Sequence, residues 1–142
     1  MNLHGCVNDA RSMFGFLVDR LHVPTSNLVL LTDTSATRQA IISKFEEHLL
    51  YNKYIQKEDT IIFYYAGHGS RLVAPTDLTS PDGKIEVICP HDTFVPSEDS
   101  QDGYIHPIPD YTLNRLLRQL ADAKGDNIVC SLSAIQYAFS AK

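Results

Sequence analysis

The segment DTIIFYYAGHGSR, residues 59–71, constrains the fold more than any other part of the chain. Its first half, Thr60–Tyr65, consists of β-branched and aromatic residues, which is typical of a strand buried on both faces. Gly67, His68 and Gly69 follow almost at once. We therefore predict that the strand ends just before Gly67 and that the two glycines let the backbone turn sharply around the histidine.

Apolar residues recur at helical or strand spacing along the rest of the chain. Helices are predicted over residues 7–21, from a cap at Thr34 or Ser35 to residue 50, and over 112–123; short strands are predicted over 27–33, 84–90 and 127–129. This alternation predicts an α/β domain with a mostly parallel sheet covered on both faces. Ligands bind beyond the carboxyl ends of such strands, so His68 lies where a site is expected.

Composition excludes several classes of function. The 142 residues fit one domain, and a net charge of −5 without a basic tract argues against a nucleic-acid partner. The longest apolar run is too short to cross a bilayer and the start is polar, so we predict neither a membrane partner nor a signal peptide. Three widely spaced cysteines without a C-x-x-C pair suit a reducing compartment, and we predict a cytoplasmic protein.

The histidine admits more than one reading. An imidazole at a strand end can act as a general acid or base, because its ordinary pKa of about 6.5 is close to neutrality. It can equally be a loop histidine that only bonds a nearby carbonyl group. A zinc site built on His68, His91 and His106 is disfavoured, because these residues lack the short spacings that preorganise zinc ligands.

A second motif, GCVNDA, opens the first predicted helix. Asp9 is expected in the first turn, where the helix dipole alone favours a carboxylate. Cys6 can be a small buried apolar residue.

Five segments, taken in order, resemble the caspase-like cysteine peptidases, and most of all the metacaspases of fungal type. They are LHGCVNDA, DTIIFYYAGHGSR, DGKIEVICPHD, IPDYTLNRLLRQL and AKGDNI. The resemblance covers residues 3–128 and implies a caspase-like three-layer α/β/α sandwich. It divides the chain into a partial large-subunit peptidase domain, residues 1–128, and a tail outside the pattern, residues 129–142.

The resemblance also assigns roles. It implies cysteine endopeptidase activity after Arg or Lys, with His68 as the catalytic acid or base and the Gly69 N–H as a donor to the oxyanion. Cys6 and Asp9 match the residues that line the pocket for the basic side chain, so a basic peptide is the expected substrate. Ala66 stands where many relatives have a serine of that pocket.

Some metacaspases need calcium, which the resemblance leaves open as a cofactor. Asp82, Asp92 and Asp110 lie in the corresponding loop region. They do not form an EF-hand pattern, and calcium needs six to eight oxygen ligands. We therefore assign no metal ligand.

The family pattern fails at the nucleophile. Relatives continue after GDNI into Asp-Cys-Cys-His-Ser, whereas this chain reads GDNIVCSLSAIQYAFSAK. Cys130 comes too early to face His68, because a strand rises only about 3.3 Å per residue. The family match gives Cys89 no catalytic role. The apolar strand that precedes G-C-x-x-D in relatives has no counterpart either, so we expect a sheet without its first strand and without the nucleophile-bearing end of a later one.

Three hypotheses follow. The chain can be a peptidase domain that is inactive on its own because no thiol serves His68. It can be a non-catalytic module that binds basic peptides, or that pairs through an open sheet edge with a full-length homologue. It can also be a fragment that does not fold independently.

Overall fold

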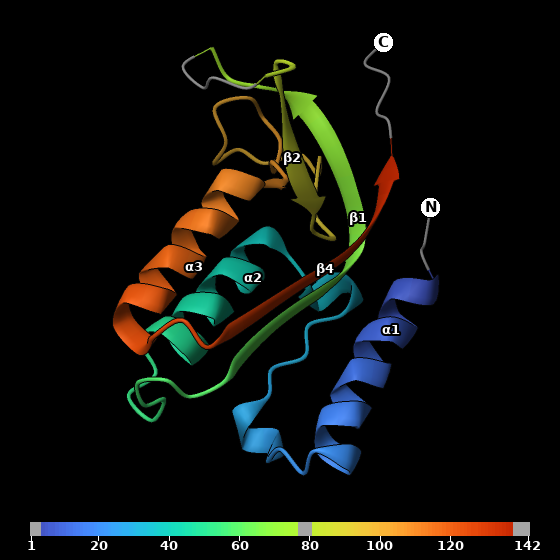
Figure 1. The fold of residues 1–142 in the computed structure, drawn as a ribbon. Coiled ribbons are helices and arrows are strands. Elements are labelled where there is room, and N and C mark those ends of the chain that lie inside the picture. The colour runs from blue at the N-terminus through green and yellow to red at the C-terminus, as the bar shows by residue number, and fades with distance from the viewer. Residues whose placement is uncertain (1–3, 77–80, 138–142) are drawn as a thin grey trace.

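The strand β1, Ile61–Val73, is the centre of the fold. The computed structural model describes residues 4–76 and 81–137, in which four strands form one sheet in the order β3–β2–β1–β4 (Figure 1). The others are β2 (Lys84–Cys89), β3 (Ile108–Pro109) and β4 (Ile128–Tyr137). β1 pairs in parallel with β4 over ten residues, and β2 and β3 continue the sheet antiparallel.

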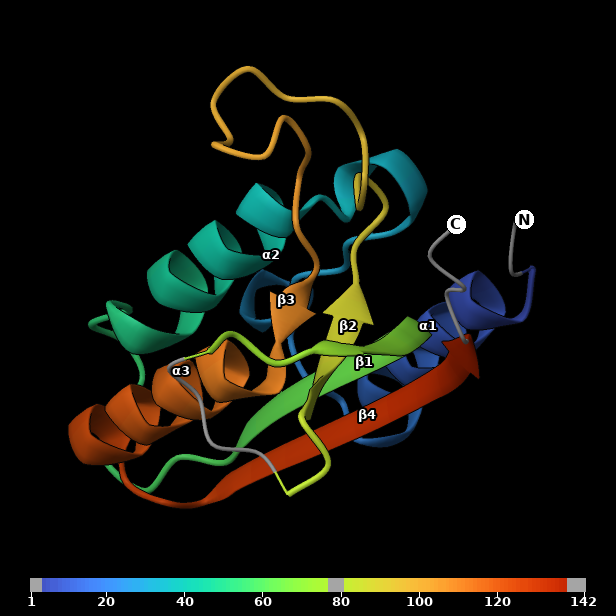
Figure 2. The same ribbon diagram turned by 90° about the horizontal axis from the view of Figure 1, so that it is seen from above.

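Three helices form the layers on either side of this sheet. α1 (His4–Gly15) continues as a π-helical turn, Phe16–Arg20; α2 (Arg38–Phe45) continues likewise as Glu46–Leu50; and α3 spans Asp110–Lys124. α2 and α3 cover one face and α1 covers the other, as Figures 1 and 2 show. The predicted α/β class, its three layers and its three helices are thus confirmed. None of the helices in the described ranges combines the length and apolarity needed to span a bilayer.

The helix starts differ slightly from the prediction. The cap of α2 is Thr37, whose hydroxyl accepts a hydrogen bond from the Ala40 N–H at 3.1 Å, and not Thr34 or Ser35. α1 begins at His4, so Asp9 lies beyond its first turn. The helix dipole therefore does not account for this carboxylate, because its effect is confined to the terminal turn.

The packed core lies on the face of the sheet covered by α2 and α3. One buried cluster consists of Phe45, Leu50, Ile61, Leu116 and Leu120, and a second of Ile41, Ile88, Ile108 and Leu113. The apolar residues of α3 recur every three or four positions, which turns one stripe of the helix toward the sheet. On the opposite face, Leu17 is the one buried residue that the structure describes in α1 and its extension. The α1 layer is therefore the more thinly packed of the two.

The strand β1 does not end where the sequence predicted. It runs on through Gly67, His68 and Gly69 to Val73, because residues 68–73 pair antiparallel with β2. Neither glycine has a positive φ angle, whereas Gly83, Gly103 and Gly125 do. The predicted sharp turn around His68 is therefore wrong, and the histidine lies within a strand.

Residues 27–33 were expected to form a buried strand, and that prediction is also wrong. The segment runs extended between short 3₁₀ turns at Thr25–Asn27 and Asp33–Ser35. Within the described ranges, the backbone of Val29, Leu30 and Leu31 makes no hydrogen bond to another backbone group. An apolar extended segment becomes a strand only when it has a partner to pair with.

The strand β4 is longer than the three residues predicted for it. It reaches Tyr137 and pairs with β1 as far as Ser70. Residues 129–137 of the predicted tail therefore belong to the sheet, and residues 138–142 lie outside the described part. The strand is thus longer than predicted, but the residues that extend it beyond Cys130, SLSAIQY, include no cysteine, so the expected nucleophile-bearing end is still absent from β4.

Candidate functional site

His68 lies where β1 gains its second neighbour. Up to Gly67 the described part of the sheet gives β1 one partner, β4, and at His68 the ladder with β2 begins. His68 is in register with Ile135 of β4 on one side and Cys89 of β2 on the other. The half-buried imidazole thus belongs to the central strand, flanked by two others.

Close packing explains the two glycines around His68. A Cβ atom at Gly67 would overlap the ring and hydroxyl of Tyr65, whose side chain extends over Gly67 toward His68. At Gly69, a Cβ atom would lie 2.9 Å from the Cβ atom of Ala134 in β4, too close for two carbon atoms. Glycine is needed at both positions because there is no space for a side chain, and not because the backbone turns there.

The hydroxyl group of Tyr65 joins the strands at this point. It lies 2.9 Å from the carbonyl oxygen of His68 and 3.0 Å from that of Cys89, so the two carbonyl groups share its single proton. Burial, followed by the nearby Cys89 and Cys6 thiols, raises the pKa of Tyr65 above its ordinary value. The phenol therefore remains a neutral donor and fixes the backbone on both sides of the His68–Cys89 pair.

The structure brings Cys6 and Asp9 to the same region. Burial raises the pKa of the Cys6 thiol, and the Asp9 charge raises it further. Cys6 in turn contributes to the raised pKa of Tyr65. Cys6 is half-buried, whereas Asp9 is exposed. Cys6 and Asp9 thus lie about one turn apart on α1, and Cys6 is close enough to Tyr65, in the middle of β1, to influence its pKa.

Gly69 is placed less favourably for its predicted role. It is buried and has partners on both sides, Ile88 in β2 and Gln136 in β4. Its N–H therefore points along the sheet toward a neighbouring strand. To bind an oxyanion, this group would need one of the two strands to move away.

The register of β4 agrees with the prediction that Cys130 comes too early to face His68. Cys130 is in register with Phe63, five residues before His68, which corresponds to about 16 Å along the strand. Residues 63 and 68 also point to opposite faces of the sheet, because side chains alternate along a strand. Cys89, to which the sequence gave no role, is the cysteine directly opposite His68. Only the strand register reveals that pairing.

Comparison with known proteins identifies the family. The sequence model of a protein family described as "Metacaspase, peptidase C14 domain" matches residues 1–132. The chain belongs to the metacaspase family. Metacaspase-4 of Arabidopsis thaliana is 30% identical over 75% of this chain, and Metacaspase-1A of Neurospora crassa is 34% identical over 63% of it. The predicted resemblance is thus confirmed.

The metacaspase chain spans only part of these relatives. It covers 26% of the Arabidopsis protein and 20% of the Neurospora protein. Among solved structures, the protein GSU0716 from Geobacter sulfurreducens is similar, with a TM-score of 0.45, 22% sequence identity, and coverage of 79% of this chain and 32% of that one.

The aspartates considered for calcium do not converge in this metacaspase chain. Asp82 pairs with Arg71, Asp92 accepts a hydrogen bond from the Arg38 N–H, and Asp110 accepts one from the N–H of the next residue. Within residues 4–76 and 81–137, no three His, Cys, Asp or Glu side chains are grouped as metal ligands would be. Asp82, Asp92 and Asp110, as the structure describes them, therefore do not fit a calcium ion.

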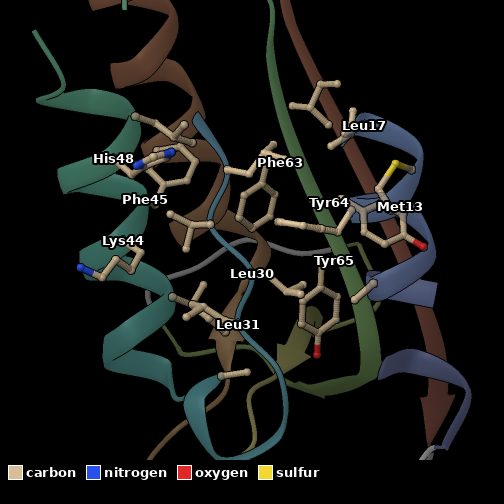
Figure 3. Close-up of a pocket in the computed structure, with 18 of the residues that line it drawn as sticks. Met13, Leu17, Leu30, Leu31, Lys44, Phe45, His48, Phe63, Tyr64 and Tyr65 are labelled. Carbon is tan, nitrogen blue, oxygen red and sulfur yellow. The ribbon is translucent and has the colours of Figure 1, made fainter. Parts of the chain in front are cut away.

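A slot lies beside β1, along the edge opposite β4 (Figure 3). It has a volume of about 220 Å³ and is lined by β1 residues 62–66, the extended residues 27–31, α1 and α2. Phe63 and Tyr65 project from β1 toward Leu30 and Leu31, whereas Tyr64 projects toward Met13 of α1, as Figure 3 shows. The slot is thus walled by helices on two sides and by extended backbone on the other two. The sequence gave no signal for it.

Proposed function

We propose that this metacaspase chain carries the histidine half of a cysteine endopeptidase site specific for Arg or Lys, and that it does not cleave peptides on its own. His68 is the acid or base, and Cys6 and Asp9 receive the basic side chain of the substrate. One observation carries the proposal: β4 runs alongside His68 with Ile135 in register and Cys130 five residues earlier, so β4 places no cysteine beside His68.

The chemistry supports this division of roles. In a cysteine peptidase, an imidazole takes the thiol proton while the sulfur attacks the peptide carbonyl, and the two groups must come within hydrogen-bond reach. Cys130 fails this requirement by its distance and by its face of the sheet. An exposed Asp9 beside a half-buried Cys6 suits a guanidinium or ammonium group. The cytoplasmic location expected from the sparse cysteines remains a prediction.

A fluorogenic peptide ending in arginine tests the proposal. We expect no release of the fluorophore above the buffer rate, with or without calcium, because removing the nucleophile of such a unit costs about as much as removing the whole unit. Full-length Metacaspase-4 serves as the positive control, and a peptide ending in aspartate as the specificity control. Turnover that both His68→Ala and Cys130→Ser abolish would overturn the proposal.

The slot beside β1 favours a second candidate, a module that binds a partner strand. Over residues 61–67, the described part of the sheet leaves one edge of β1 unpaired, and across the slot the backbone of Val29–Leu31 also lacks backbone partners. Unpaired strand edges bind extended peptides. Since helices wall the slot above and below, its occupant would carry apolar side chains on both faces. An apolar strand of a full-length homologue has these properties.

Co-purification with full-length Metacaspase-1A tests this candidate. We expect a complex on size exclusion that Ile62→Asp disrupts, because Ile62 lines the slot and its charged replacement would be buried there. Val73→Asp is the matched control, since Val73 belongs to the same strand but is 82% exposed and lies outside the slot. Failure to form a complex, or equal effects of both substitutions, would contradict strand binding at this edge.

A further inference from the structure

The pairing of β1 with β2 begins with a histidine opposite a cysteine. His68 and Cys89 form the first register pair of this antiparallel ladder. Residues directly opposite one another project to the same face of the sheet, with Cβ atoms about 4.5–5.5 Å apart. The imidazole and the thiol thus start from neighbouring positions on one surface, at a distance that their side chains can bridge.

Two further observations make this pair more than a coincidence of register. The proton of the Tyr65 hydroxyl is shared between the carbonyl groups of both residues, which ties the two backbones to the same side chain. His68 and Cys89 are both half-buried, so a small reagent can reach them while bulk water is partly excluded. The pair is therefore held in place and accessible.

The other two cysteines lack this arrangement. Cys130 is exposed on β4 and in register with Phe63, on the opposite face from His68. Cys6 lies on α1, where burial and then the Asp9 charge raise the pKa of its thiol and disfavour the thiolate. Of the three thiols, Cys89 is the one that the strand register brings to an imidazole.

We propose that Cys89 and His68 form a thiol–imidazole pair that makes Cys89 the preferred site of reaction with soft carbon electrophiles. His68 accepts the proton of the Cys89 thiol as the sulfur attacks the electrophilic carbon. With iodoacetamide, the S–C bond forms, the C–I bond breaks, iodide leaves, and the imidazolium returns its proton to water. The adduct then lies beside His68 and covers one side of the imidazole.

The burial of Cys89 makes the participation of His68 testable. Burial raises the pKa of the Cys89 thiol, so without help this cysteine would be less ionised than an ordinary one at pH 7. Since the thiolate is the nucleophile, burial alone predicts slow alkylation. A base within hydrogen-bond reach of the thiol predicts fast alkylation, because a positioned general base typically raises the reaction rate by about a hundredfold or more.

The experiment measures alkylation of the whole chain by iodoacetamide at pH 7, with each cysteine followed separately by peptide mass spectrometry. We expect folded Cys89 to react several times faster than Cys89 in the urea-unfolded chain, whereas Cys6 reacts more slowly when folded. This comparison needs no variant. Folded Cys89 reacting at the unfolded rate or more slowly would overturn the pairing.

A matched pair of histidine variants identifies the base. His68→Gln is expected to slow Cys89 alkylation by about tenfold or more, as loss of a general base does, without changing the rate at Cys130. His91→Gln is the control, because His91 is closer to Cys89 in sequence but lies exposed beyond the end of β2. Equal rates at Cys89 in the wild type and His68→Gln, or a matching loss in His91→Gln, would exclude His68 as the base.

Discussion

Replacing Gly67 by alanine is expected to lower the free energy of unfolding by about 3 kcal/mol, the upper part of the usual range for overpacking. The new methyl group would occupy the space of the Tyr65 ring and hydroxyl. Tyr65 can avoid it only by turning away, and it would then lose its hydrogen bonds to the carbonyl groups of His68 and Cys89. Urea denaturation followed by circular dichroism measures the change.

A double-mutant cycle with Tyr65→Val isolates the cause. Once the ring is removed, Gly67→Ala should become neutral or stabilising, since alanine in a strand gains about 0.5–1 kcal/mol over glycine. The two substitutions are therefore expected to couple strongly, as contacting residues do. An unchanged penalty for Gly67→Ala in the Tyr65→Val background would contradict the steric explanation.

Gly15 provides a matched control for the glycine substitution. It is helical, and a Cβ atom there would meet only the Asp19 carboxylate at 3.7 Å, an ordinary contact. Gly15→Ala is thus expected to stabilise the chain by about 0.5–1 kcal/mol. Opposite signs at Gly15 and Gly67 would show that local space decides the effect of each substitution.

The elements that the sequence predicted well are those set by local pattern. The leucines of α3 recur at helical spacing, and Gly125, with a φ of 93°, ends that helix as expected. The strand β2 was predicted from its own apolar residues. Such patterns depend on about a dozen neighbouring residues, so they can be recognised without knowledge of the tertiary fold.

The strand boundaries depended instead on partners that are distant in the sequence. β1 continues through Gly67–Gly69 because β2 pairs with it, and an isolated Gly-His-Gly reads as a turn. Residues 27–33 have a strand's composition, but residues 29–31 make no backbone hydrogen bond within the described ranges, so apolarity alone gave the wrong answer. The serines after Cys130 hid the length of β4 in the same way. The composition of a segment indicates whether it is buried, whereas the length of a strand can be determined only when its pairing register is known.

The candidate site shows the same division. The sequence predicted His68, Cys6 and Asp9; the structure places Cys6 and Asp9 on α1, with Cys6 near Tyr65, and His68 within β1, and their roles remain predictions. It gave no indication that Cys89 faces His68, because the two residues lie 21 positions apart and only the ladder brings them together. It also could not show that Tyr65 ties the two strands.

Replacing Leu120 by alanine is the second substitution with a large expected effect. Leu120 has no exposed surface and packs with Phe45, Leu50 and Ile61, so it joins α3 to α2 and to the start of β1. The loss of its side chain should lower the free energy of unfolding by about 3–4 kcal/mol, within the range for buried leucines. Thermal and urea unfolding measure this loss.

Leu117 supplies the control on the same helix, because it is only partly buried against the same cluster. Leu117→Ala should cost about half as much, since less apolar surface returns to water. The comparison also tests whether the chain folds on its own. This needs testing because one edge of β1 is unpaired along the slot. A single cooperative transition in the wild type, lowered far more by Leu120→Ala than by Leu117→Ala, means that the α2–α3 face holds the sheet together despite its open edge. A wild-type chain without such a transition, or with equal losses in both variants, would mean that this core does not form unaided.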